Sequence, residues 1–431
     1  MPRYDRYQKL SREISGSVVR GEVAPRWSTD GTQVGFAFQG KNFIVDLKTG
    51  QRTEGEIPAS GAAGGGRGDR RRAPERGRQF TEVFTADGKL KAFYRDRNVW
   101  LSDADGKNER AVTTEGSTEK RTKFGQASWV YGEELSVREA MWFSPDGRFL
   151  AYYGFDESKV KDYYLTLNHS GIQTVLDVEA YPKAGTDNPV VGLYVHDLKA
   201  GKTVTVDTDF GDASVGHYVY QVRWSPSGNE LLFNRTNRKQ NVMQFCAADP
   251  ASGKCRVVVE EKRPQSWTEN TPAITWLKDN KAFIWRSDRN DFNNLYLGNI
   301  DGRPLKPLTN HAFEVAALVR LDEENGRFFY AARSGENPYL LQLHKMNLDG
   351  TGGARLSDPK FNTGTIQFSP DLKFFTCHEE RTNVPVRTAL RDDNGKLIAV
   401  LAESDLTKFD ELGLKRSERF VCKAADGVTD I

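Results

Sequence analysis

Two adjacent carboxylates, Glu133 and Glu134, follow Trp-Val-Tyr-Gly in the stretch WVYGEEL. Neighbouring side chains of a β-strand point to opposite faces, so such a pair can act together only on a helical turn or in an irregular loop. Gly132, directly before the pair, favours that departure from a strand. Close carboxylates repel one another unless a cation lies between them. A peptide N-terminus, largely charged at pH 7 and carrying three N–H donors, would suit both carboxylates.

The same pair has plainer interpretations. It could be a solvated acidic turn whose charge is balanced by Arg138 or Lys123. An acid and nucleophile pair of a glycosidase is a poor match, because those carboxylates flank the bond from opposite sides, about 5 Å or more apart. The sequence indicates no further metal ligands nearby and no zinc-ligand spacing, so we expect neither a metal nor a cofactor.

A repeated unit along the chain must position these residues. It consists of an apolar-x-apolar entry, a turn resembling Ser-Pro-Asp-Gly, an alternating apolar strand and a hairpin, as in PRWSTDGTQVGFAF, AMWFSPDGRFLAYY, QVRWSPSGNELLFN and IQFSPDLKFFTC. The turn residues supply the backbone angles of a short reversal, and the alternation places every second side chain on one face. Most copies are about 40 to 50 residues apart, the period of β-propeller blades.

The sequence therefore predicts an all-β fold, a β-propeller of about seven four-stranded antiparallel blades. An eighth blade is left open, because the unit at 140–219 is long enough to hide additional strands. Two segments break the pattern. Residues 57–79 are rich in Gly and then Arg and predict a flexible loop, whereas the apolar spacing in 403–416 predicts a short amphipathic helix.

Composition agrees with a fold of many short strands. Of 431 residues, 38% are hydrophobic, 11% are aromatic and 39 are glycine. The 61 Lys and Arg nearly balance the 59 Asp and Glu, so no net field attracts nucleic acid or an anionic membrane. No apolar run reaches the roughly 20 residues that span a bilayer. The N-terminus lacks the apolar core of a secretory signal, so the protein is cytoplasmic or a leader lies outside this sequence.

The cysteines leave two interpretations open. Cys246 and Cys255 flank the turn-like AADPASGK and could face each other across two strands. They are then either two free, half-buried thiols or a disulfide.

The chain resembles the N-terminal propeller of the dipeptidyl peptidase IV family, a branch of the prolyl-oligopeptidase-type serine peptidases that removes N-terminal dipeptides. Three family motifs occur here in order: Trp-Val-Tyr-x-Glu-Glu in WVYGEEL, Trp-x-Ser-Pro-x-Gly in WFSPDG, and Tyr-Pro-Lys-Ala-Gly-x-x-Asn-Pro in YPKAGTDNP. In weaker form the resemblance covers essentially the whole chain. It implies that residues 1–415 are the substrate-selecting propeller and that 416–431 begin an α/β-hydrolase domain.

The resemblance also assigns roles to individual residues. Glu133 and Glu134 would grip the free amine of the substrate, and Tyr131 would orient them by packing. The family's arginine for the substrate carbonyl has Arg76 or Arg78 as its substitute, the alternative being a solvated basic loop. Trp267 occupies roughly the place of an aromatic residue near the substrate, or is a tryptophan of the propeller core.

In other respects this chain departs from the family. The chain has no Gly-x-Ser-x-Gly nucleophile elbow, and the nearest approach is DASVG at 212–216. Six histidines lie in propeller segments and are interpreted as structural or surface residues: His169, His196, His217, His311, His344 and His378. We therefore expect no catalytic residue in this chain and no peptidase activity from it alone.

The implied partners are a peptide with a free N-terminus and a catalytic α/β-hydrolase domain in the full-length protein. A homodimer is left open, and neither nucleic acid nor a membrane span is expected. The competing function class is a stand-alone propeller that acts as an interaction scaffold. Such a scaffold has no need of an amine-binding pair.

Overall fold

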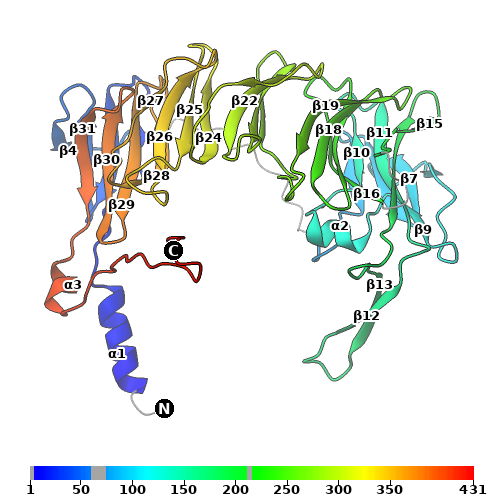
Figure 1. The fold of residues 1–431 in the computed structure, drawn as a ribbon, viewed down its shortest axis with the longest axis horizontal. Coiled ribbons are helices and arrows are strands. Elements are labelled where there is room, and N and C mark those ends of the chain that lie inside the picture. Colours follow the sequence, from blue (N-terminus) through cyan, green and yellow to red (C-terminus); the bar gives the residue numbers. More distant parts are fainter. Residues whose placement is uncertain (1–3, 60–73, 211–215) are drawn as a thin grey trace. The chain divides into compact units, whose positions relative to one another are not determined.

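The computed structural model describes residues 4–59, 74–210 and 216–431 (Figure 1). The chain divides into two compact units, which are described separately. Unit 1 comprises Met1–Gly68, Phe292–Asn294 and Leu308–Ile431, and unit 2 comprises Asp69–Asp291 and Leu295–Pro307.

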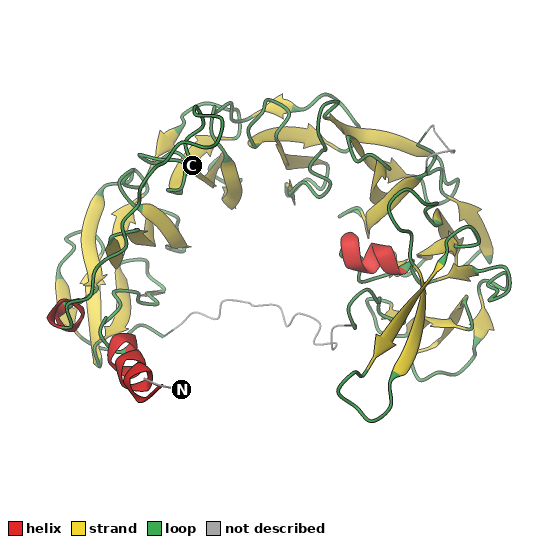
Figure 2. Cartoon of the chain, turned by 60° about the horizontal axis from the view of Figure 1, so that its bottom comes forward, coloured by secondary structure: helices red, strands yellow, loops and turns green. Residues whose placement is uncertain are grey.

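Both units are built from four-stranded antiparallel sheets, the yellow arrows of Figure 2, whose strands mostly pair in chain order. Unit 1 contains three of them: β1 (Arg26–Trp27), β2 (Gln33–Phe38), β3 (Lys41–Asp46) and β4 (Arg52–Glu54); β24 (Val315–Asp322), β25 (Arg327–Ala332), β26 (Gln342–Asn347) and β27 (Ala354–Arg355); and β28 (Asn362–Phe368), β29 (Phe374–Arg381), β30 (Val384–Asp392) and β31 (Leu397–Glu403).

Unit 2 contains four sheets of this kind, the second of which gains a fifth strand described below: β5 (Glu82–Phe84), β6 (Leu90–Arg95), β7 (Asn98–Asp103) and β8 (Arg110–Ala111); β10 (Met141–Phe143), β11 (Phe149–Asp156), β14 (Val190–Asp197) and β15 (Lys202–Thr205); β16 (His217–Trp224), β17 (Leu231–Asn237), β18 (Val242–Ala248) and β19 (Cys255–Lys262); and β20 (Ile274–Trp276), β21 (Ala282–Ser287), β22 (Asn294–Asn299) and β23 (Lys306–Pro307).

The repeated turn motif produces one repeated geometry between the first two strands of a sheet. In the turn at 144–147, the Ser144 hydroxyl donates to Asp146 Oδ1 (2.6 Å), and Gly147 takes the positive φ of 69° that closes the reversal. The Ser144 hydroxyl also accepts the Phe149 amide (2.9 Å), which starts the next strand. Because these bonds favour the charged carboxylate, the pKa of Asp146 lies below its ordinary value, with the Ser144 bond as the largest cause.

The extra length between 140 and 219 does not form an eighth sheet within the described ranges. It is taken up by a two-stranded hairpin of β12 (Asp162–Leu167) and β13 (Val175–Ala180), inserted between β11 and β14. A further short strand, β9 (Thr122–Phe124), pairs with β11. The predicted all-β propeller class with four-stranded antiparallel blades is confirmed: among the described residues, six sheets have four strands and one has a fifth strand, β9, beside its four.

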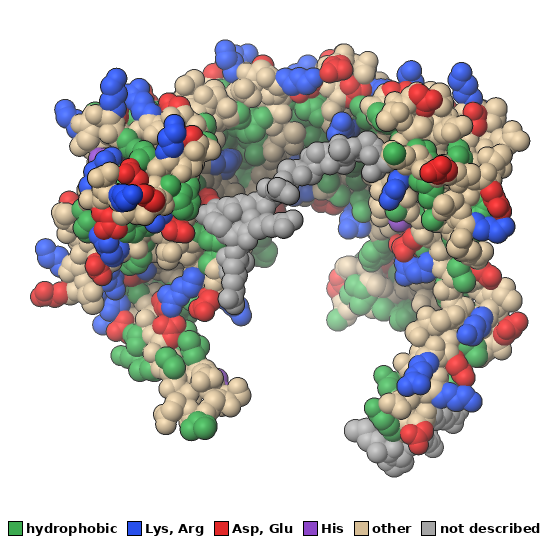
Figure 3. All heavy atoms as spheres, turned by 180° about the vertical axis from the view of Figure 1, so that it is seen from behind, with side chains coloured by type: hydrophobic (Ala, Val, Ile, Leu, Met, Phe, Trp, Pro, Cys, Tyr) green, Lys and Arg blue, Asp and Glu red, His purple; other side chains and the backbone are tan. Residues whose placement is uncertain are grey.

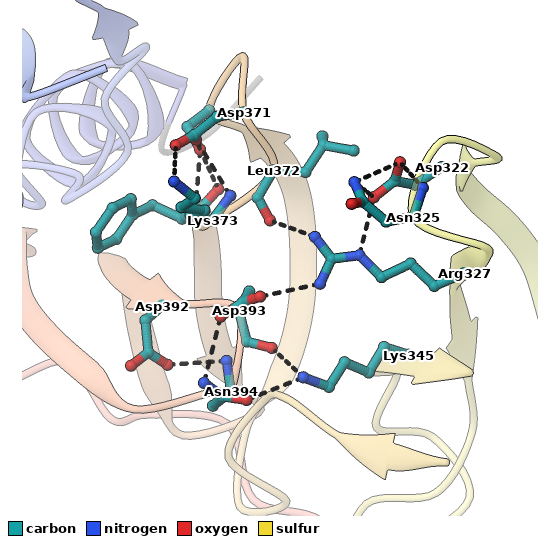
Figure 4. A network of polar contacts seen from close by, with 12 residues as sticks. Asp322, Asn325, Arg327, Lys345, Asp371, Leu372, Lys373, Asp392, Asp393 and Asn394 are labelled. Carbon is teal, nitrogen blue, oxygen red and sulfur yellow. Dashed lines mark hydrogen bonds and ion pairs between the residues drawn. The ribbon is translucent and has the colours of Figure 1, made fainter. Parts of the chain in front are cut away.

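Burial is most complete in the central strands of some sheets. In β11, FLAYYGFD, every residue but the last is buried, as expected for a strand that packs on both faces. In unit 1 a polar network joins two neighbouring sheets (Figure 4). Arg327 on β25 donates to Asp322 Oδ2 (2.8 Å) and to Asp393 Oδ2 (2.9 Å), and Lys345 on β26 donates to the Asp393 carbonyl (2.8 Å).

Two helices lie near the ends of the chain. The helix α1 (Tyr4–Ser15) was not predicted. The helix predicted over 403–416 is shorter, because α3 covers only Thr407–Glu411. Strand β31 continues to Glu403, the Asp405 carboxylate accepts the Thr407 amide (2.8 Å) as the helix begins, and Gly413 takes a positive φ of 65° after its end.

The surface carries charges of both signs. In the space-filling view of Figure 3, Lys and Arg side chains are interspersed with Asp and Glu side chains, in keeping with the balanced composition. No helix in the described part of the chain is long and apolar enough to cross a membrane.

Candidate functional site

The two glutamates lie on a short helix, α2 (Trp129–Glu134), in unit 2. Ser128 precedes it in an extended conformation, and the Tyr131 amide donates to the Ser128 carbonyl (2.9 Å) to close the first turn. Glu133 and Glu134 are the last two helical residues, and the last turn holds no basic residue. The carboxylates therefore stand at the negative end of the helix, where a cation is favoured.

A glycine lets this helix approach a neighbouring segment closely. A Cβ at Gly132 would overlap the carbonyl oxygen of Gly77 and would lie 2.8 Å from Gln79 Nε2. Gly77 itself has a positive φ of 76°, and a Cβ there would overlap the Trp129 indole. The backbone of 76–79 therefore lies directly against α2, and any larger residue at position 132 would push it away.

Tyr131 anchors the opposite side of the helix. Its ring is fully buried and packs edge-on against Phe155, with ring centres 4.8 Å apart, and against Tyr153 at 6.1 Å. Its hydroxyl accepts the Val219 amide of β16 (3.3 Å). Burial raises the pKa of Tyr131 well above its ordinary value, so the phenol stays neutral. These contacts fix the orientation of α2 on the sheets beneath it.

The two carboxylates differ in their surroundings. The Glu133 side chain is 12% exposed, and its Oε1 forms an ion pair with the guanidinium of Arg76. Glu134 is exposed and has no hydrogen-bond or ion-pair partner among the residues that the structure describes. Lys123, considered above as a partner, pairs instead with Glu157 (2.9 Å), and Arg138 lies exposed. The site therefore combines two carboxylates with one guanidinium and keeps one net negative charge.

Arg78 faces a different part of the unit. Its Nη2 donates to Asp177 Oδ2 (3.0 Å) and also pairs with Glu179, both on β13 of the hairpin. Burial raises the pKa of Glu179, and the guanidinium of Arg78 opposes that rise. The two arginines proposed for one role thus contact different elements, and only Arg76 reaches the glutamate pair.

Trp267 and the predicted loop at 57–79 are the remaining predictions to compare with the structure. Trp267 is 74% exposed in the loop before β20, and no hydrogen bond, ring contact or ion pair joins it to α2 in the described part of unit 2. Residues 60–73 of the predicted flexible loop lie outside the described residues, as does DASVG apart from Gly216. By contrast, Gly77 and Gln79, at the end of that predicted loop, are buried against α2.

The sequence analysis did not predict the contacts that hold residues 76–79 against α2. The Gln79 side chain donates to the carbonyls of Gly77 and Val137 (both 3.3 Å) and accepts the Ala127 amide (3.1 Å). It therefore bonds the chain on both sides of α2. No local sequence pattern predicts such contacts, because Gln79 lies 48 residues from Ala127.

A pocket of about 250 Å³ has among its lining residues Leu135, which directly follows Glu134 in the chain, together with Trp142 and Tyr153. No group of three His, Cys, Asp or Glu side chains that could hold a metal occurs in the ranges 4–59, 74–210 and 216–431. Cys246 on β18 and Cys255 on β19 are free thiols, the first fully buried.

Comparisons with known proteins point to one family. A family model described as the dipeptidyl peptidase IV (DPP IV) N-terminal region matches residues 36–386. A probable dipeptidyl peptidase 4 of Arthroderma benhamiae is 24% identical over 94% of this chain and 51% of its own length. A probable dipeptidyl-aminopeptidase B of Phaeosphaeria nodorum is 25% identical over 65% of this chain and 34% of its own length. This chain thus spans about a third to a half of these relatives.

Solved structures agree on the fold. The crystal structure of Porphyromonas gingivalis dipeptidyl peptidase 4 aligns with a TM-score of 0.62 at 20% identity, over 94% of this chain and 56% of that one. A putative dipeptidyl aminopeptidase IV from Bacteroides ovatus aligns with a TM-score of 0.58 at 22% identity, over 93% of this chain and 55% of that one. Since the family model covers most of its length, the chain belongs to the dipeptidyl peptidase IV N-terminal region family.

Proposed function

We propose that this chain is the substrate-selecting part of a dipeptidyl-peptidase-like serine peptidase that removes N-terminal dipeptides of the Xaa-Pro type. The observation that carries the proposal is the pair of adjacent carboxylates at the end of α2, one ion-paired to Arg76 and the other exposed and without a partner among the described residues. Family membership and the names of the relatives support it.

The ammonium of a peptide N-terminus would complete the charge balance of this site. Glu134 offers a carboxylate that has no partner in the described part of the chain, and Glu133 has a second oxygen, Oε2, beside the one that Arg76 contacts. One ammonium has three donors and can bond both side chains at once. A lysine side chain offers the same ammonium, so selectivity for the N-terminus has to come from the depth of the site.

Arg76 suits a second role toward the substrate. Its side chain is 82% exposed, so N–H donors that do not bond Glu133 face solvent. A guanidinium carries five donors in a fixed plane. Such donors can bind the carbonyl of the first substrate residue while the same group holds Glu133. Apolar surface from Leu135 and Trp142 in the adjacent pocket can receive a substrate side chain.

Binding of the substrate's N-terminal amine would determine which peptide bond is cleaved. With the N-terminus held by Glu133 and Glu134, only the second peptide bond would reach a nucleophile at a fixed place. We propose that this nucleophile is the serine of a Ser-Asp-His triad in an α/β-hydrolase domain, where an oxyanion hole stabilises the acyl-transfer transition state. Because the sequence contains no Gly-x-Ser-x-Gly, we expect the 431-residue chain by itself not to cleave peptides.

The test compares peptide binding with and without a free amine. An Xaa-Pro peptide should bind the chain at least about tenfold more tightly than its N-acetylated form, since a charge-assisted hydrogen bond contributes about 1.5–3 kcal/mol. Replacing both Glu133 and Glu134 by Gln should remove this difference. The matched control replaces Glu323 and Glu324 by Gln, an adjacent pair after β24, and should keep it. Equal binding of the two peptides by the unaltered chain would refute the amine site.

One observation favours the scaffold alternative. The hairpin β12–β13 exposes apolar side chains, with Tyr164 64% and Leu176 61% exposed. Exposed apolar surface of this kind often marks a protein interface. If the peptide test fails, a role in protein association is the function that this surface supports.

A further inference from the structure

The segment 76–79 contacts two different elements through alternate residues. Arg76 pairs with Glu133 at the end of α2, whereas Arg78 pairs with Asp177 and Glu179 on β13. Between them Gly77 lies under the Trp129 indole and against Gly132. The segment therefore joins the glutamate helix to the hairpin within unit 2.

The anchor at the hairpin is specific. Asp177 and Glu179 are alternate residues of β13, so both side chains lie on the same face of the hairpin, and both contact Arg78. Glu179 is almost fully buried, and a buried carboxylate is stable in its charged form only with a partner. Arg78 is its ion-pair partner among the described residues. Loss of Arg78 would thus leave the hairpin and the segment without their shared charge contact.

Aromatic contacts join the same two elements. The Trp129 ring packs edge-on against Tyr181, which follows β13, with ring centres 5.3 Å apart. Tyr181 in turn contacts Tyr163 on β12 at 5.6 Å. The base of the hairpin, α2 and the segment 76–79 therefore form one contiguous group of contacts within unit 2.

We propose that Arg78 is a positioning residue for the amine site: its ion pairs with Asp177 and Glu179 hold the segment 76–79 in place and thereby keep Arg76 on Glu133. This inference rests on the proposed function of Glu133 and Glu134. Arg78 does not touch the substrate in this scheme. It acts through the backbone of Gly77 and through Arg76, and it makes the hairpin part of the substrate-binding machinery.

The experiment measures, for the full chain, the ratio between the Kd of an N-acetylated Xaa-Pro peptide and that of its free-amine form. Arg78→Ala should lower this ratio about fivefold, since residues of one ion-pair network are energetically coupled. Arg78→Lys, which keeps the positive charge, should keep most of the ratio of the unaltered chain. In the Arg76→Ala background, Arg78→Ala should have no further effect on the ratio, because its action passes through Arg76.

Arg121→Ala is the matched control. Arg121 also anchors the hairpin, through Asp162 (2.7 Å) and the carbonyls of Glu157 (3.1 Å) and Val160 (3.0 Å), but among the described residues it forms no hydrogen bond or ion pair with the segment 76–79. It should leave the ratio near that of the unaltered chain. A ratio unchanged by Arg78→Ala, or lowered as much by Arg121→Ala, would overturn the inference while leaving the amine site intact.

Hydrogen exchange gives a readout that needs no peptide. Amides of residues 76–79 should exchange faster in Arg78→Ala than in the unaltered chain, and no faster in Arg121→Ala. Unchanged exchange in Arg78→Ala contradicts the positioning role, whatever the peptides do. Equal binding of both peptides by the unaltered chain would instead refute the proposed function, and the inference would fall with it.

Discussion

The carbonyl oxygen of Gly77 occupies the space that a Cβ on Gly132 would need, so the glutamate helix and the segment carrying Arg76 meet backbone to backbone. This contact explains a glycine directly before the two carboxylates. It also means that the position of Arg76 depends on the absence of a side chain at Gly132.

Gly132→Ala should therefore damage the site without touching a charge. The added methyl group forces Gly77 and Gln79 away, and we expect about 1–3 kcal/mol of lost stability together with a lower preference for free-amine peptides. Thermal unfolding and the two-peptide comparison measure both effects. Gly364→Ala on β28 is the control, because nothing lies within 4 Å of its Cβ position. Equal behaviour of the two variants would contradict the close approach.

Arg76→Ala should weaken free-amine peptide binding about tenfold, the usual effect of one charge-assisted hydrogen bond. Glu133 then loses the guanidinium that fixes its carboxylate, and the substrate carbonyl loses a donor. Arg148→Ala removes another arginine with an ion pair, to Asp197 (3.0 Å), and should leave peptide affinity unchanged. Isothermal titration of both variants provides the comparison. Tighter binding by Arg76→Ala would show that Arg76 competes with the amine instead of supporting its site.

The sequence predicted the parts of this structure that repeat or that depend on neighbouring residues. The turn motif around Ser144 and Asp146 specifies a reversal through its own side-chain bonds, so each copy marks a new sheet. The departure of Glu133 and Glu134 from strand geometry followed from their adjacency and from Gly132, and α2 is that departure.

Contacts between distant segments were beyond such reasoning. Arg76 and Arg78 look equivalent in sequence, yet their partners lie 57 and 99 residues away on different elements. The helix α1 carried a usable signal, since Tyr4, Tyr7 and Ile14 recur near helical spacing, but these side chains remain exposed. Helix α3 was predicted too long: β31 continues to Glu403 before it, and Gly413 takes a positive φ of 65° soon after its last residue.

Glu379 on β29 should be essential for the stability of unit 1. It is fully buried, and its two oxygens accept hydrogen bonds from Arg387 (2.7 and 2.9 Å) and Arg391 (2.6 and 2.9 Å). Glu379→Gln leaves the buried guanidinium of Arg391 without a countercharge, so we expect a loss of about 3–5 kcal/mol in urea unfolding. Glu22→Gln, in an exposed pair with Arg20, should have little effect. A stable Glu379→Gln variant would show that the arginines find other partners.

His344 on β26 should make unit 1 sensitive to acid. Burial lowers its pKa to about 4 from an ordinary value of 6.5, and the nearby His311 and Arg355 add to the effect. At a pH between these two pKa values, His344 is protonated in the unfolded chain and neutral in the folded chain. The stability from neutral His344 is therefore complete above about pH 6.5 and is lost as the pH falls toward 4, by about 2 kcal/mol at pH 5.

Urea unfolding of the unaltered chain and of His344→Gln at pH 7.5 and pH 5 checks this expectation. The Nε2 atom of His344 lies 2.7 Å from the Ser334 hydroxyl, and an amide can keep such a bond, so the variant should fold. Its stability should fall less on acidification than that of the unaltered chain, by about the same 2 kcal/mol. His169→Gln, in the exposed turn of the β12–β13 hairpin, should show the acid response of the unaltered chain. If His344→Gln loses as much stability at pH 5 as the unaltered chain, the acid sensitivity of unit 1 comes from other groups.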